Sequence, residues 1–158
     1  MAFRGFILLL GLAGPVTAQT PSHQRLDIAT EVSPYNLEAS DLDRDGRVDL
    51  AFVSQTAGTL GIAWQGSEGE YQVRTVAQGL DRPEALAVLD LEGDGDMDIV
   101  VAEAGADRVV SFLNSGDGDF VAGPVHPVGS SPHALLADDV DGDGDADLLV
   151  SNFRGASV

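Results

Sequence analysis

Three short segments of the sequence carry closely spaced carboxylates in one shared pattern. They read DLDRDGRVD at 41–49, DLEGDGDMD at 90–98 and DVDGDGDAD at 139–147. Positions one, three and five can direct carboxylates toward a common centre, and the glycine at position six permits a sharp reversal of the chain. Position seven can offer its backbone carbonyl as a ligand, and the carboxylate at position nine can complete the coordination of a bound ion. Oxygen donors in a flexible cage suit Ca²⁺ better than Mg²⁺, and a zinc site is excluded because no Cys or His lies in any of the three segments. The pattern predicts about three calcium sites.

Two other kinds of structure could have segments of this type: an EF-hand and a simple Asp-Gly turn. An EF-hand requires a glutamate at position twelve and flanking helices, whereas position twelve here is Phe52, Val101 or Val150 inside an apolar run. Simple Asp-Gly turns in an acidic protein would also account for a single segment. Three segments in one register, each with four correctly spaced carboxylates, favour the metal site over turns alone.

The charge of the chain is concentrated in these segments. The sequence has 26 acidic residues against eight arginines and no lysine, for a formal net charge of −18, and fourteen of the acids lie in the three segments. Such a surface is a poor partner for nucleic acid or anionic membranes. Because 44% of the residues are hydrophobic, the chain has enough apolar surface to fold and is not an acidic disordered tail.

The segments belong to a tandem repeat that must position them. Asp41, Asp90 and Asp139 are spaced by 49 residues, as are Gly46, Gly95 and Gly144, and Pro34, Pro83 and Pro132. The same offset aligns AWQGSEGEY at 63–71 with FLNSGDGDF at 112–120. We therefore divide the region 19–158 into units 22–70, 71–119 and 120–158, of which the third is ten residues short.

Within a unit, the apolar pattern predicts short strands and no helix. Continuous apolar runs alternate with mixed runs, and the connections are rich in Gly, Pro, Asp and Asn. Four strands in a period near 50 residues predict an all-β fold of tandem four-stranded β-propeller blades. The expected strands are 35–40, 49–54, 59–64, 71–77, 85–90, 98–103, 107–113, 120–126, 134–138 and 147–151.

The N-terminus has the pattern of a secretory signal peptide. Arg4 precedes an apolar run over 5–13, a Gly-Pro pair follows, and Val16 and Ala18 stand at the small-residue positions of a cleavage site. The apolar run is too short for a spanning helix of about 20 residues, so no membrane span is expected. We expect residues 1–18 to be removed after Ala18 and the protein to be secreted or periplasmic, where calcium is abundant.

The repeats resemble a known family in these same residues. DLDRDGRVDLAFV, DLEGDGDMDIVVA and DVDGDGDADLLVS, together with the connecting NSGDGDF, are similar to FG-GAP (VCBS) repeats, as in integrin α-chain propellers and secreted bacterial proteins. The resemblance implies one blade per repeat, with a calcium loop between its first and second strands. The implied side-chain ligands are Asp41, Asp43, Asp45, Asp49, Asp90, Glu92, Asp94, Asp98, Asp139, Asp141, Asp143 and Asp147, and the implied position-seven carbonyls belong to Arg47, Asp96 and Asp145. Glu92 departs from the usual aspartate, which makes the second loop the least regular.

The resemblance also raises the question of completeness. Family propellers close with about seven blades, and propellers in general need about four to eight. The chain holds fewer than three units, so we interpret it as a truncated or fragmentary member, with self-assembly into a composite propeller as the alternative.

No catalytic constellation is found in the sequence. Ser130 and Ser131 lack the flanking glycines of a nucleophile elbow. His133 follows the repeated proline where Tyr35 and Glu84 stand in the other units, a position that suits either a binding surface or, as we expect, an exposed loop. We predict a secreted, non-catalytic, calcium-binding propeller module for extracellular protein or glycan. The alternative is a fragment of a secreted lyase or hydrolase whose catalytic residues lie elsewhere.

Overall fold

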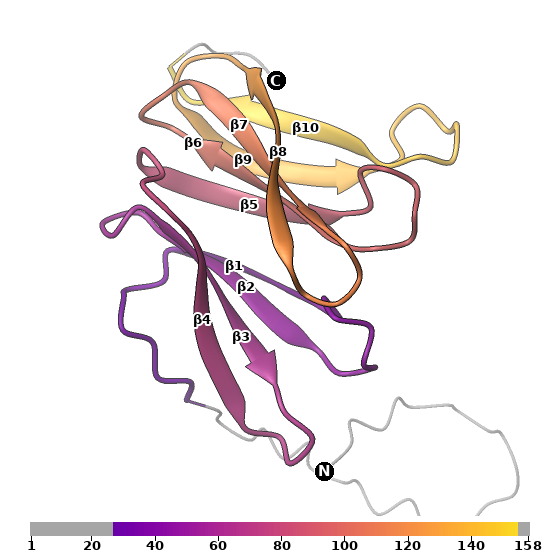
Figure 1. Ribbon diagram of the computed structural model, residues 1–158. Helices are drawn as coiled ribbons and strands as arrows, with labels where there is room; N and C mark the ends of the chain where they lie inside the picture. Colours follow the sequence, from indigo (N-terminus) through magenta and orange to yellow (C-terminus); the bar gives the residue numbers. More distant parts are fainter. Residues whose placement is uncertain (1–26, 155–158) are drawn as a thin grey trace, which may run out of the picture.

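The computed structural model describes residues 27–154 of the chain, which form ten strands and no helix (Figure 1). The predicted signal peptide at 1–18 lies outside these residues. Within 27–154 there is accordingly no long apolar helix of the kind that crosses a membrane.

The strands form three antiparallel sheets in chain order. The first sheet contains β1 (Asn36–Ser40), β2 (Asp49–Ser54), β3 (Thr59–Gln65) and β4 (Tyr71–Gln78). The second contains β5 (Pro83–Leu89), β6 (Asp98–Glu103), β7 (Arg108–Asn114) and β8 (Phe120–Pro127), and the third contains β9 (Pro132–Asp138) and β10 (Asp147–Asn152). Each sheet is a simple meander, which confirms an all-β fold of propeller-like blades, two with four strands and one with two.

The predicted strand positions are confirmed to within two residues at each end. The clearest difference is that β5 and β9 begin at Pro83 and Pro132, two residues earlier than expected. A proline cannot donate to a ladder, so it is tolerated at the first position of a strand. The pairing of β5 with β6 shifts register between Pro83 and Ala85, and that of β9 with β10 shifts near Pro132.

The first strands of the three sheets lie next to one another. β1 contacts β5, and β5 in turn contacts β9. The acidic loops all follow these strands: they join β1 to β2, β5 to β6 and β9 to β10, and they project from the same side of the molecule, on the right in Figure 1. The strands that follow the loops begin at Asp49, Asp98 and Asp147, so the 49-residue period of the sequence is also the period of the structure.

Two apolar cores hold the sheets face to face. The first core joins the first and second sheets through residues such as Val53, Ile62, Leu86 and Phe112. The second core packs the opposite face of the second sheet against the third sheet. Neighbouring residues of one strand therefore enter different cores: Val101 lies in the first and Val100 in the second. This explains the continuous apolar runs, because a strand covered on both faces has no solvent side.

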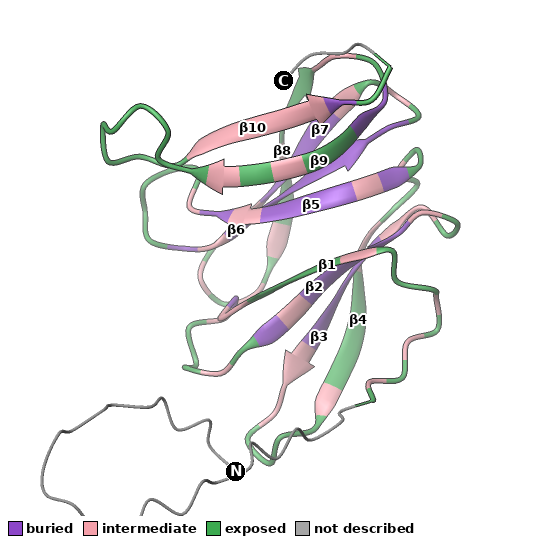
Figure 2. Ribbon diagram, turned by 180° about the vertical axis from the view of Figure 1, so that it is seen from behind, coloured by how far each residue is buried: buried purple, intermediate pink, exposed green. Residues whose placement is uncertain are grey.

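Burial differs between the inner and outer strands of a sheet. Figure 2 shows buried residues concentrated on β2, β5 and β6, whereas β4 is largely exposed. The second and third sequence units open with such an outer strand, since Tyr71 and Phe120 begin β4 and β8. The second unit therefore spans the last strand of the first sheet and the first three strands of the second.

A close approach of ring and backbone in the first sheet gives a test of this packing. Gly61 pairs with Phe52 across β2 and β3, and a Cβ at Gly61 would lie 2.6 Å from Cζ of the Phe52 ring. We expect Gly61→Ala to lower the free energy of unfolding by about 1–3 kcal/mol, because overpacking a filled core forces neighbours to move. Urea denaturation measures the change. In a Phe52→Ala background, Gly61→Ala should lower the free energy of unfolding much less. An equal loss of stability in both backgrounds would contradict the contact between residue 61 and the Phe52 ring.

Candidate functional site

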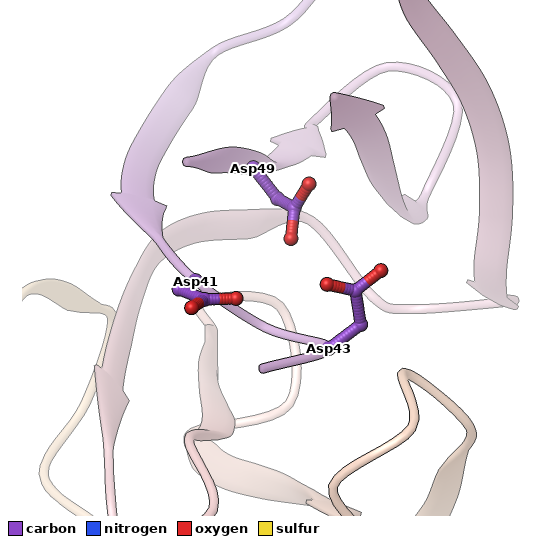
Figure 3. Close-up of side chains that lie close together, drawn as sticks. All are labelled: Asp41, Asp43 and Asp49. Atoms are coloured by element: carbon purple, nitrogen blue, oxygen red, sulfur yellow. The ribbon is translucent and has the colours of Figure 1, made fainter. Parts of the chain in front are cut away.

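The first acidic loop gathers three carboxylates around one point. Asp41 lies at the end of β1, Asp43 in the loop and Asp49 at the start of β2, and each offers an oxygen within 4.8 Å of the other two. Figure 3 shows the three side chains converging from these separate parts of the chain. Three carboxylates at this separation repel one another unless a cation or a proton lies among them.

Backbone hydrogen bonds fix the shape of this loop. Asp41 accepts bonds from the backbone N–H of Asp45 at 3.1 Å and of Gly46 at 2.9 Å. Gly46 has φ +81°, and its counterparts Gly95 and Gly144 have φ +88° and +98°. The predicted reversal at position six is therefore confirmed, and it requires glycine because side chains rarely adopt this conformation.

The position-nine aspartate connects the loop to the rest of its sheet. Asp49 is 1% exposed, and its two oxygens accept bonds from the backbone N–H of Gln65 in β3, at 2.8 Å, and of Leu42, at 3.1 Å. Burial raises the pKa of Asp49, and the negative charges of Asp43 and Asp41 act in the same direction, against the two hydrogen bonds. A bound cation would remove this cost of holding Asp49 ionised.

The third loop repeats the arrangement of the first. Asp139, Asp141 and Asp147 likewise offer oxygens within 4.8 Å of one another, and Asp139 and Asp141 are exposed. Asp139 accepts bonds from the backbone of Gly142 and Gly144, and Asp147 from that of Val140 at 3.1 Å. The same three positions, one, three and nine, are thus brought together in two separate loops.

The second loop differs from the other two. Among residues 27–154, the groups of three carboxylates with mutually close oxygens are those of the first and third loops, so Asp90, Glu92 and Asp98 do not form one. Desolvation acts to raise the pKa of Asp90, but hydrogen bonds from Gly95, Gly93, Asp94 and Glu92 together lower it. Glu92 occupies position three with a side chain one methylene longer than aspartate, which is the irregularity noted in the sequence.

A cation from the first loop reaches the second. The Nη2 atom of Arg44 lies 2.5 Å from Oδ1 of Asp96 and 3.3 Å from the carbonyl oxygen of Asp94. Arg44 stands at position four, where the other loops have Gly93 and Gly142, and it adopts φ +59° as they adopt φ +71° and +82°. The Asp96 side chain therefore forms an ion pair between neighbouring sheets, in addition to the carbonyl role predicted for this residue.

Positions five and seven are linked within each loop. The carboxylates of Asp45, Asp94 and Asp143 accept a bond from the backbone N–H two residues ahead, at Arg47, Asp96 and Asp145, over 2.9–3.0 Å. The Arg47 guanidinium also forms an ion pair with Asp45 and donates to the Gln65 carbonyl at 2.7 Å. Position five is therefore outside the gathered group, and its carboxylate stabilises the turn.

One residue that holds the loops was missed in the sequence. Asn114, at the end of β7, donates to the carbonyl of Leu42 in the first loop at 2.7 Å and to that of Met97 in the second at 3.1 Å. Its oxygen accepts bonds from Gly116 and Gly118 in the following turn. The sequence identifies Asn114 only as part of the connecting NSGDGDF segment, because nothing local in a sequence reveals a bond across 72 positions.

Comparison with known proteins agrees with the repeat. The profile of the FG-GAP-like repeat family matches residues 41–101 and again residues 90–150, and each match starts at an acidic loop and ends after the next one. No curated protein matched the chain.

Proposed function

The chain belongs to the FG-GAP-like repeat family and is a β-propeller-like repeat module, and we propose that it is a secreted, non-catalytic, calcium-binding protein that binds extracellular protein or glycan. The observation that carries the calcium assignment is the convergence of positions one, three and nine in the first and third loops. Carboxylate oxygens from Asp41, Asp43 and Asp49, with backbone carbonyls and water, are the donors that Ca²⁺ takes.

The role of the metal in this proposal is structural. Each loop joins the first two strands of a sheet, and Asp49 and Asp98 hold their loops to the third strand. A cation bound among the carboxylates would neutralise repelling charges and hold the loop, the strand before it and the strand after it together. Secretion fits this role, because extracellular calcium modules have dissociation constants of about 10⁻⁴–10⁻³ M and rely on the calcium outside the cell.

The binding role rests on the architecture. Sheets that pack face to face leave their connecting loops at two ends, where residues are free of the demands of the core. The acidic loops occupy one of these ends. The other end is therefore available for a partner, and a macromolecular ligand of the cell exterior suits a secreted module.

A calcium titration of the purified protein tests the proposal. The test is specific because the second loop should bind calcium differently from the other two. We expect two tighter sites, in the first and third loops, and one weaker site in the second, where Glu92 alters the geometry. Glu92→Asp should tighten the weak site about three- to tenfold, because the shorter side chain restores position three of the other loops. Isothermal titration calorimetry measures stoichiometry and affinity together.

The matched control is Glu68→Asp, the same chemical change at an exposed residue outside the loops. It should leave the calcium isotherm unaltered. A titration that gives no saturable heat in the millimolar range, or one that responds equally to both substitutions, would contradict the calcium assignment.

A further inference from the structure

A cavity lies at the opposite end of the inner strands from the acidic loops. It has a volume of about 250 Å³, and residues that line it include Tyr35, Glu84 and His133. These residues stand at the beginnings of β1, β5 and β9, whereas the acidic loops follow the ends of the same strands. We call this feature the end cavity. The expectation that His133 lies in a loop is wrong, because His133 is part of β9, whereas its expected exposure is confirmed; its ring contacts Glu84.

The repeat itself indicates that the end cavity is not required by the fold. Tyr35, Glu84 and His133 are 49 residues apart, and each follows the proline that recurs in every unit. At positions that the fold requires, such as that proline and the glycine of the acidic loop, the three units keep the same residue. Here three chemically different side chains occupy one repeat position and line one cavity. The fold therefore does not restrict this position to one residue type, and its side chains are free to contact a ligand.

The polar groups of the end cavity leave one cation without a partner. The Glu84 carboxylate is surrounded by donors: Gln55 Nε2 at 3.0 Å, Arg82 Nε at 3.3 Å and His133 Nδ1 at 2.5 Å. Arg82 is further occupied by Ser131 Oγ and the Ala104 carbonyl. Within residues 27–154, by contrast, no carboxylate pairs with the exposed guanidinium of Arg154, which also lines the cavity. Among the lining residues the formal charges of Arg82 and Arg154 exceed that of Glu84 by one, and the neighbouring carboxylate of Asp107 accepts bonds from Ser130 and Ser131 rather than from an arginine.

Aromatic rings are exposed beside this cation. Among the described residues, the large hydrophobic side chains that are exposed include two aromatic ones, Tyr35 at 54% and Phe153 at 76%, and both line the end cavity. The Phe153 ring centroid lies 5.9 Å from that of His133. Exposed rings with a few placed polar groups are typical of small-ligand sites.

We propose that the end cavity binds a hexuronate, an acidic monosaccharide unit, with its carboxylate on Arg154 and a C–H face of its ring against Tyr35 or Phe153. A planar guanidinium matches a carboxylate through two parallel hydrogen bonds, and one net positive charge matches one carboxylate. The volume is slightly below the roughly 300–1,000 Å³ of drug-sized sites and suits a single sugar ring. This inference rests on the proposed binding role, for which it names the ligand, and it does not depend on calcium.

The negative charge of the chain does not prevent this binding. Strands of five to seven residues, β1, β5 and β9, separate the end cavity from the acidic loops, which at about 3.3 Å per residue is roughly 17–23 Å. The Debye length at physiological ionic strength is about 8 Å, so the loops are largely screened at that distance. The local charge of the cavity therefore decides the sign of the ligand.

Titration with D-glucuronate and D-glucose tests the proposal, because the two rings differ in a carboxylate against a hydroxymethyl group. By NMR titration of the purified protein, we expect glucuronate to bind with a dissociation constant in the millimolar range and glucose at least tenfold more weakly. Acetate supplies the carboxylate without the ring and should also bind at least tenfold more weakly. Acetate that binds as tightly as glucuronate would overturn the assignment of a sugar ring.

Two substitutions locate the site. Arg154→Gln should weaken glucuronate binding at least tenfold, and Phe153→Ala should weaken it about three- to tenfold. Arg74→Gln is the matched control, because Arg74 is an exposed arginine on β4, outside the end cavity, and its loss changes the net charge equally. Unchanged glucuronate binding by Arg154→Gln, equal losses in both arginine variants, or no binding by the wild type would overturn the proposal.

The same samples separate this inference from the proposed function. The calcium-dependent shift in melting temperature is measured for the wild type and for each variant. A normal calcium shift without glucuronate binding refutes the hexuronate site alone. Glucuronate binding without a calcium shift refutes the calcium assignment and leaves the end cavity supported.

Discussion

Removal of calcium should lower the melting temperature of this protein by roughly 10 °C. At about 1 mM calcium, a site with a dissociation constant near 10⁻⁴ M contributes roughly 1.4 kcal/mol to the free energy of unfolding. The first and third loops together then contribute about 3 kcal/mol, and the weaker site of the second loop adds less than about 1.4 kcal/mol to this. Melts followed by circular dichroism, in 1 mM calcium and in excess chelator, measure the difference.

Substitution of single carboxylates identifies the loops responsible. Asp141→Asn removes one of the three converging charges of the third loop, so it should abolish about 1.4 kcal/mol of the calcium-dependent stability and leave the chelated protein unchanged or slightly more stable. Asp119→Asn, at an acidic residue of the turn before β8, serves as the control and should retain the full calcium shift. Identical melting temperatures of the wild type with calcium and with chelator would contradict the calcium sites and support the interpretation of the acidic loops as simple Asp-Gly turns.

Asp98→Ala should destabilise the protein even in the absence of calcium. Asp98 is 1% exposed, and its oxygens accept bonds at 2.8 Å from the backbone N–H of Leu91, in the second loop, and of Asn114, in β7. The substitution leaves both donors without a partner, at about 1–3 kcal/mol each. We expect the free energy of unfolding in excess chelator to fall by about 2–6 kcal/mol, measured by urea denaturation.

Asp119→Ala is the control for Asp98→Ala. Asp119 lies in the turn between β7 and β8 and has the same charge as Asp98. Its side chain is exposed and accepts no hydrogen bond among the described contacts. Its removal should change stability by no more than about 0.5 kcal/mol. If Asp98→Ala costs as little as this in chelator and becomes costly only with calcium, then position nine acts through the metal alone and its bonds to β7 contribute nothing.

Most of the architecture follows from local patterns in the sequence. The strand positions, the reversal at Gly46 and the 49-residue period were predicted, because apolar runs, glycine and proline impose their constraints on the residues next to them. The convergence of Asp41, Asp43 and Asp49 is part of the predicted four-carboxylate cluster, of which position five lies outside the gathered group, and a bond from Gln65 in β3 also holds Asp49 in place. Calcium binding itself stays a prediction.

The tertiary structure decided the relations between units. Only packing shows that Arg44 crosses to Asp96, that Asn114 holds Leu42, and that Val100 and Val101 face different cores. It also places Tyr35, Glu84 and His133 around one cavity, although the sequence separates them by 49 residues each. The physical reason is that a repeat fixes the shape of each sheet through local interactions, whereas contacts between sheets depend on how whole sheets stack, and a side chain at the end of a strand acquires its neighbours only when that stacking is complete.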